Sequence, residues 1–189
     1  MKKIFVVVIL FFMTVLTYAA VPNWKIVPNE SSISFTATQN NAPMSGSFKT
    51  FSGDIHFDPA QLADSHVKIN IALDSVTTSY KEVGDTLKTA DWFDISAFPQ
   101  AVFTADKFKK ISDKTFEADG TLTLRDKTVP VVLHFVLEDY SSTHARAKGT
   151  VVLKRTAFGV GQGDWAKTDE IKDEVKVEFV VVATAYPLP

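Results

Sequence analysis

Cysteine is absent from this chain of 189 residues. The chain therefore has no disulfide, no thiol nucleophile and no cysteine metal ligand, and an exported form would depend on its packed core for stability. Net charge is also small, since 20 Lys and Arg residues stand against 22 Asp and Glu residues. A nearly balanced charge gives no strong attraction to nucleic acid or to an anionic membrane surface.

Residue patterns typical of catalysis or metal binding are scarce as well. None of the four histidines, His56, His66, His134 and His144, lies two or four residues from another, the spacings that put two ligands on one strand or helix face. The chain has no G-x-S-x-G motif, and the glycines at 159–163 lack the spacing and context of a phosphate-binding loop. We predict no catalytic residue, no metal site and no cofactor, although strand pairing could still bring His56, His66 or His134 together.

What is present begins with a segment that has the plan of a secretory signal. Two lysines precede an apolar run from Ile4 to Leu16, and Thr17-Tyr18-Ala19 follows with a small residue at its end. We expect residues 1–19 to be a signal peptide that is cleaved after Ala19. A retained anchor is the alternative, but the run falls short of the about 20 apolar residues that span a bilayer. Residues 20–189 are then one domain without stable membrane insertion.

Beyond Pro22, apolar and polar residues alternate with a period of two. The pattern is clear in Val67-Lys68-Ile69-Asn70-Ile71 and recurs from Phe116 to Leu124 and from Val175 to Ala183. Such alternation is typical of strands with one buried and one solvated face, and many short strands separated by turns indicate a sandwich or a barrel. The segments Val129 to Leu137 and Val180 to Val182 are apolar on both phases, so we expect both of their faces to be covered.

One segment, near residues 79–95, interrupts the strands with helical spacing. Residues 79–82 have the form of a capping box, but Gly84 weakens a helix that starts at Ser79, so a start at Asp85 is the alternative. Pro99 forces the chain out of helical angles. Four aromatic residues straddle this boundary between helix and strand: Trp92, Phe93, Phe98 and Phe103. Because they cannot share one face of one element, we expect them to line a corner or rim.

The interior of such a barrel can be full or hollow. About eight strands enclose just enough space for the chain's own side chains or for one small ligand. Of the 15 phenylalanines, twelve lie beyond residue 19 and supply abundant apolar volume. Composition and periodicity leave both alternatives open.

Short motifs in a fixed order resemble the YceI-like proteins, which are exported lipocalin-like domains associated with polyisoprenoid binding. The resemblance runs from Trp24 to about Tyr186 and includes Phe51-Ser52-Gly53-Asp54-Ile55-His56-Phe57-Asp58, Leu87-Lys88-Thr89-Ala90-Asp91-Trp92-Phe93-Asp94 and Arg155-Thr156-Ala157-Phe158-Gly159-Val160. Two positions depart from the family. Asp126 stands where a glycine is common, and we expect this aspartate to tolerate left-handed backbone angles. Ala157 stands where an aspartate is common, which puts in doubt a carboxylate partner for Arg155 there.

The resemblance implies an all-β fold, namely an extended antiparallel eight-stranded lipocalin-like barrel with a short helical excursion near residues 79–95. It also implies an exported, periplasmic, non-catalytic protein whose long apolar cavity holds an isoprenoid lipid, an isoprenoid quinone or a similar amphiphile. The inward-facing phase of the doubly apolar strands is a guess. The expected ligand-binding residues, with Trp92 and Phe93 at the rim, are Phe35, Phe48, Ile69, Ile71, Trp92, Phe93, Phe103, Leu122, Leu133, Phe135, Phe158 and Phe179.

Two other functions remain open. A hydrolytic enzyme acting on a bound lipid would need His56, His66 or His134 to face inward near an acid. A packed structural or partner-binding β domain would have a solid, sealed interior. The sequence determines neither the natural lipid nor the oligomeric state, and a homodimer is compatible with it.

Overall fold

The computed structural model describes residues 20–186, so the predicted signal peptide lies outside the described residues. Among the helices described, none has the length and apolar character needed to cross a membrane. The strands are β1 (Asn23–Ile26), β2 (Ser32–Gln39), β3 (Ala42–Phe48), β4 (Phe51–His56), β5 (His66–Ala72), β6 (Val76–Thr78), β7 (Gln100–Lys110), β8 (Thr115–Leu124), β9 (Lys127–Tyr140), β10 (His144–Lys154) and β11 (Glu174–Tyr186). The helices are α1 (Lys81–Leu87) and the short 3₁₀ turns η1 (Pro28–Glu30), η2 (Leu62–Asp64), η3 (Leu73–Ser75), η4 (Arg155–Phe158) and η5 (Gly163–Trp165).

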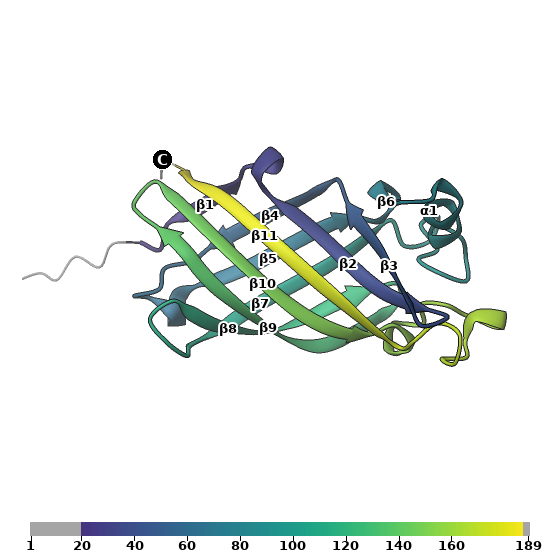
Figure 1. Ribbon diagram of the computed structural model, residues 1–189. Coiled ribbons are helices and arrows are strands. Elements are labelled where there is room, and N and C mark those ends of the chain that lie inside the picture. The colour runs from purple at the N-terminus through teal and green to yellow at the C-terminus, as the bar shows by residue number, and fades with distance from the viewer. Residues whose placement is uncertain (1–19, 187–189) are drawn as a thin grey trace, which may run out of the picture.

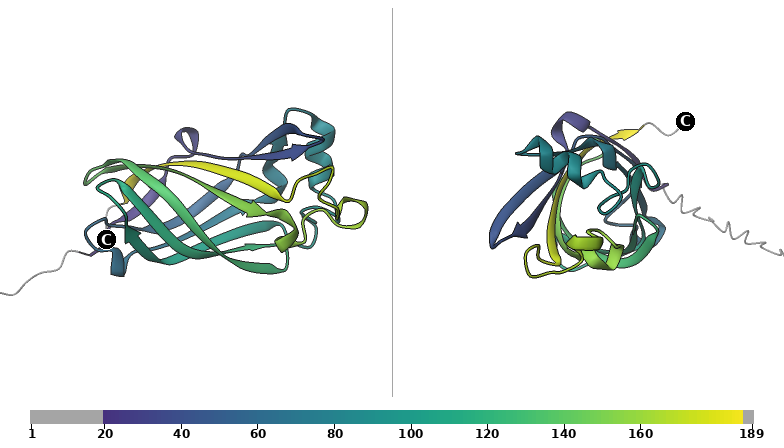
Figure 2. Two further views of the ribbon diagram at one scale, coloured as in Figure 1. Left: turned by 60° about the horizontal axis from the view of Figure 1, so that its bottom comes forward. Right: turned by 90° about the vertical axis from the view of Figure 1, so that its right-hand side faces the viewer.

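The strands close into one antiparallel barrel with eight strand positions (Figures 1 and 2). Three positions are each made of two consecutive strands: β1 with β2, β3 with β4, and β5 with β6. β11 closes the ring, because its residues 183–186 pair with β1 while its residues 176–180 pair with β2. The predicted eight-stranded barrel is therefore confirmed.

The wall has one place where strand pairing stops. β7 pairs with β5, but no ladder joins β6 to β7 within residues 20–186. Helix α1 and the segment that follows it lie at this end of the barrel, beside β6 (Figure 1). The backbone N–H of Leu73 donates to the Pro99 carbonyl at 3.0 Å, which ties the end of this segment to the wall. The helical excursion thus closes the barrel where the ladder ends.

The predicted capping box is wrong in detail. Helix α1 begins at Lys81 with Tyr80 as its N-cap, and no side chain caps it. The reason is that β6 stays paired with β3 as far as Thr78, which leaves Ser79 between the strand and the helix.

Two tight turns use left-handed residues other than glycine. Asn40 and Asn41, with φ of 49° and 64°, connect β2 to β3 as the sequence indicates. In the turn between β8 and β9, Arg125 has a φ of 56°, whereas Asp126 is not left-handed. The hairpin forms as expected, with Arg125 and not Asp126 as its left-handed residue. The side chain of Arg125 bonds to the segment after α1, as described below.

The doubly apolar segments differ in their coverage. Val132 on β9 is 44% exposed, so the expectation that Val129 to Leu137 is covered on both sides is wrong. A single-layer barrel wall leaves its outer face to solvent unless a loop crosses it. Val182 on β11 is only 1% exposed, because residues beside η1 cross its outer face. There the Val182 carbonyl accepts hydrogen bonds from the Val27 N–H at 2.8 Å and the Ser31 hydroxyl at 3.2 Å.

Two glycines provide a matched test of how closely the backbone of neighbouring strands approaches in the barrel wall. A methyl group at Gly120 on β8 would press on the Thr104 carbonyl oxygen and lie 2.9 Å from the Ala105 Cβ. At Gly84 in α1 the nearest atom to such a methyl group is 3.6 Å away. We expect Gly120→Ala to lower the free energy of unfolding by about 1–3 kcal/mol through overpacking. Gly84→Ala should raise it by about 0.5–1 kcal/mol through helix propensity. Chemical denaturation of both variants measures the difference, and equal effects would contradict the close approach at Gly120.

Candidate functional site

An apolar cavity runs along the inside of the barrel. It extends from Trp24 and Phe57 near one end to Leu87 and Trp92 near the other, with a volume of about 300 Å³. Arg155 is the only charged residue among its lining residues. An apolar protein cavity of about 150 Å³ stays dry and binds benzene, so this space suits on the order of a dozen carbon atoms.

The twelve residues predicted to bind a ligand all line this cavity. They are Phe35, Phe48, Ile69, Ile71, Trp92, Phe93, Phe103, Leu122, Leu133, Phe135, Phe158 and Phe179. On β9, Leu133 and Phe135 belong to the inward phase, while Val132 and His134 are exposed. That these side chains contact a ligand stays a prediction.

The predicted ligand-binding set contains only large side chains and omits the small ones that leave the space open. Six alanines line the cavity: Ala37, Ala101, Ala118, Ala145, Ala147 and Ala183. Their signal in the sequence is an alanine on the apolar phase of an alternating strand, as at Ala145 and Ala147. Other lining residues outside the predicted set include Trp24, Phe57 and Val177.

Aromatic side chains pack together at the end of the cavity away from α1. The ring of Phe57 lies edge-on to the rings of Phe108, Phe116 and Phe135, at centroid distances of 5.3, 5.7 and 5.8 Å. The indole Nε1–H of Trp24 donates to the Phe57 carbonyl at 2.9 Å. This bond holds Phe57 over the interior and satisfies the buried indole.

Two segments of the chain meet at the other end of the cavity. The Asp91 carbonyl, in the segment after α1, accepts the backbone N–H groups of Gly161 and Gln162 at 2.8 Å each. The rings of Trp92 and Trp165 lie 5.7 Å apart across the same junction. The end therefore consists of two mutually supported segments, residues 81–99 and 155–173.

Arg125 attaches the first of these segments to the barrel wall. Its Nη1 donates to the Ala90 carbonyl at 2.7 Å and also to the Trp92 carbonyl. Its guanidinium lies 5.6 Å from the centre of the Phe98 ring, a cation–π arrangement. The left-handed turn residue between β8 and β9 thus positions the rim aromatics.

Arg155 holds the second segment from inside. Its side chain is buried, with the residue only 4% exposed, and all its hydrogen bonds go to backbone carbonyls. Nε donates to Lys172 at 3.2 Å, Nη1 to Val160 and Gly161 at 2.9 and 3.4 Å, and Nη2 to Lys167 and Ile171 at 2.7 and 3.0 Å. A guanidinium has five N–H donors, so none remains for a ligand.

The polar groups near the cavity therefore leave few hydrogen-bond donors or acceptors free for a ligand. Burial lowers the pKa of Arg155, and the charge of Asp173 opposes that change. Asp173 instead accepts bonds from the backbone and hydroxyl of Thr156 at 3.0 and 2.8 Å. The indole Nε1 of Trp92 is buried and has no hydrogen-bond partner among the described residues.

The histidines lie outside the cavity. His134 is near Glu117 at 3.4 Å, His144 bonds to Asp139 at 2.9 Å, and His56 lies against His66. None of the four is among the cavity-lining residues. The inward histidine that a hydrolytic site would require is therefore not found, and the open interior contradicts a solid packed domain.

A closed antiparallel barrel around one apolar cavity places this chain in the class of hollow β-barrel proteins. Within that class, residues 24–183 match the model of the YceI-like domain, and the chain belongs to this family. The resemblance drawn from the short motifs is confirmed.

Relatives of known sequence and structure agree. A UPF0312 protein of Azotobacter vinelandii is 29% identical over 140 residues, which cover 71% of this chain and 73% of the relative. The crystal structure of Burkholderia cenocepacia BcnA is 31% identical with a TM-score of 0.80, covering 84% of this chain and 99% of BcnA.

A polyisoprenoid binding domain from Saccharophagus degradans, implicated in plant cell wall breakdown, is 14% identical with a TM-score of 0.68, covering 87% of this chain and 99% of that domain. The Campylobacter jejuni YCEI protein is 21% identical with a TM-score of 0.67, covering 99% and 100%. These last two share the fold.

The clamp formed by Arg155 can be tested by removing its charge and donors. We expect Arg155→Met to lower the free energy of unfolding by on the order of 3 kcal/mol, because several buried carbonyls lose their partner. Hydrogen exchange should increase across residues 159–173. Arg146→Met is the matched control, since Arg146 is a surface residue paired with Glu138 at 2.9 Å and such pairs contribute about 0–1 kcal/mol. Equal effects of the two substitutions would contradict the clamp.

Tyr140, whose ring lies 5.5 Å from Trp24, provides a pH-dependent test of the opposite end. Burial, followed by the negative charge of Asp58, raises the pKa of Tyr140 to about 12. The unfolded value is about 10, so the folded state keeps the proton longer. The stability linked to this proton is present below pH 10 and is lost as the pH rises through about 12. Absorbance titration of tyrosinate should show a step near pH 12 that Tyr140→Phe removes; an unchanged titration in the variant would refute the assignment.

Proposed function

We propose that this protein binds the hydrocarbon tail of a polyisoprenoid lipid or similar amphiphile inside the barrel, without catalysis, in the bacterial periplasm. The observation that carries the proposal is the apolar cavity, whose one charged lining residue has all its donors engaged by the protein. The polyisoprenoid binding domain of Saccharophagus degradans, which has the same fold, supports this ligand class.

The energetics suit a carrier with moderate affinity. Each buried methylene contributes about 0.8 kcal/mol, so a dozen carbons supply on the order of 10 kcal/mol. Association costs about 4–15 kcal/mol in lost freedom of motion and ordering. The gain and the cost are of similar size, which suits moderate affinity and a lipid that can be released to a membrane or to another protein.

The apolar lining also favours the tail as the part of the ligand that lies inside. A phosphate or quinone head group buried there would find no free donor and would lose its hydration, which costs several kcal/mol. The tail therefore occupies the barrel and the polar group stays at an end, in contact with water. Isoprenoid quinones and prenyl carriers both meet this requirement.

Export is supported by the composition of residues 1–19. The intact mass of protein recovered from a bacterial periplasm tests it: we expect a chain that begins at Ala20. A mass that retains residues 1–19 would contradict cleavage.

The decisive experiment is to purify the protein without detergent, extract it with organic solvent and identify the extract by mass spectrometry. We expect a lipid with a long hydrocarbon tail, present in about one copy per chain. Recovery of no lipid, together with no binding of added prenyl alcohols or quinones, would remove the proposal.

Adjacent residues on β10 provide a matched pair of variants. Val151 lines the cavity, whereas Val152 is 58% exposed on the outside of the same strand. We expect Val151→Trp to fill part of the cavity and to reduce the lipid recovered by at least about tenfold, since a shortfall of 1.4 kcal/mol already costs a factor of ten. Val152→Trp should retain the lipid of the wild type. Circular dichroism checks that both variants fold, and equal lipid content in the two would place the ligand elsewhere.

A further inference from the structure

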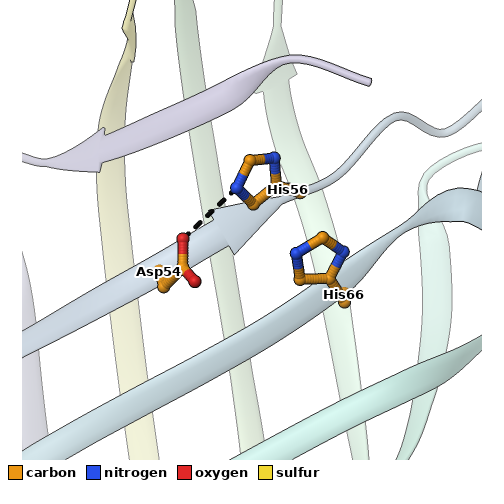
Figure 3. A group of neighbouring side chains, drawn as sticks. All are labelled: Asp54, His56 and His66. Atoms are coloured by element: carbon orange, nitrogen blue, oxygen red, sulfur yellow. Dashed lines mark ion pairs between the residues drawn. The ribbon is translucent and has the colours of Figure 1, made fainter. Parts of the chain in front are cut away.

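Strand pairing creates a cluster of potential metal ligands on the outer face of the barrel (Figure 3). Asp54 and His56 occupy alternate positions on β4, so their side chains leave the same face. His66 begins β5 directly opposite His56. The neighbours Ile55 and Val67 line the cavity, and the three polar side chains therefore point away from it.

The three side chains already lie close together. The imidazole rings of His56 and His66 are stacked, with centroids 4.4 Å apart and planes inclined by 17°. His56 Nε2 is 3.3 Å from Asp54 Oδ1. One ligand atom from each residue lies within 4.8 Å of the other two.

These distances are close to those of a bound ion. Zinc lies about 2.0–2.2 Å from nitrogen and oxygen ligands, so two ligand atoms of a tetrahedral ion are about 3.3 Å apart. The nitrogen of His66 lies within 4.8 Å of the other two ligand atoms, and the stacked imidazoles must reorient for both rings to coordinate one ion. The side chain of Asp54 is 63% exposed and that of His56 is 26% exposed, so the cluster is open to an ion from solvent.

We propose that Asp54, His56 and His66 bind one divalent transition-metal ion, for which zinc has the best-matched chemistry. Two imidazoles and one carboxylate suit zinc, copper or nickel, whereas calcium and magnesium prefer ligand sets made of oxygen alone. Three protein ligands leave one position of a tetrahedral ion for water. The site is separate from the cavity and does not depend on the proposed lipid.

The surroundings include one group that opposes an ion and one that helps it. Lys68 lies directly opposite Asp54 on β5, on the same face, where its positive charge repels a cation. Asn23 on β1 lies opposite His56 on the other side and carries an amide oxygen. Within residues 20–186 this is the only group of at least three candidate ligands that converges.

A bound ion would join β4 to β5 where the ladder between them ends. Because binding to the folded state alone stabilises it by mass action, zinc should raise the unfolding temperature of the protein. The same ion should not change the lipid recovered, since the cavity lies on the other face of these strands.

The test is calorimetric titration of zinc chloride into mature protein prepared without a polyhistidine tag. We expect one saturable site per chain. His56→Ala and His66→Ala should each weaken binding by at least about tenfold, and the double variant should show no saturable site. Lys68→Gln should tighten binding severalfold, because it removes the repelling charge.

His134→Ala and His144→Ala are the matched controls, since each of these histidines faces a single carboxylate. They should bind zinc as the wild type does. The proposal fails if the wild type shows no saturable zinc binding, if His56→Ala and His66→Ala bind as tightly as the wild type, or if the control substitutions weaken binding equally. Circular dichroism and the content of extracted lipid confirm that each variant is folded.

Discussion

The closed backbone ladder is the constraint on which the rest of this structure depends. Each strand position pairs with a neighbour on both sides, apart from the gap between β6 and β7, and the strand number sets the diameter of the ring. The wall therefore cannot collapse onto its contents. Where inward residues are alanines such as Ala118 and Ala147, space remains that a loosely organised core would have filled.

At both ends of the barrel, side chains that pack beside the cavity also satisfy buried polar groups. At one end the Trp24 indole bonds to the carbonyl of Phe57, whose ring covers the interior. At the other, Arg155 gathers the carbonyls of residues 159–173 from within, while Arg125 holds the segment after α1 from the wall. A charge inside an apolar space would be costly if unpaired. Here it is fully hydrogen-bonded, and the interior remains apolar to a ligand.

Alternation was enough to predict strands, and the interruption near residues 79–95 was enough to predict the helix. The hollow interior did not follow from periodicity, because an inward phenylalanine such as Phe103 has the same pattern in a full barrel and in an empty one. It was the resemblance to YceI-like proteins that favoured the hollow alternative. Features that depend on register across strands could be named only as possibilities. Strand pairing was expected to be able to bring His56, His66 or His134 together, but spacing along the chain does not select His56 and His66, which lie ten residues apart. The contacts of Arg155 could not be predicted, because its five acceptors are backbone atoms and leave no mark in the sequence.

The apolar lining has a consequence for how any guest would sit. The cavity wall offers a hydrocarbon tail no hydrogen bond. The contact energy therefore depends mainly on the length of tail inside the barrel, and little on which carbon of the tail lies beside which ring. A tail could move along the barrel axis in small steps, because successive positions would differ little in free energy. Tails that differ by a methyl branch or a double bond would therefore be hard to tell apart, and the membrane's own supply of amphiphiles, more than the protein, would decide which molecule is carried.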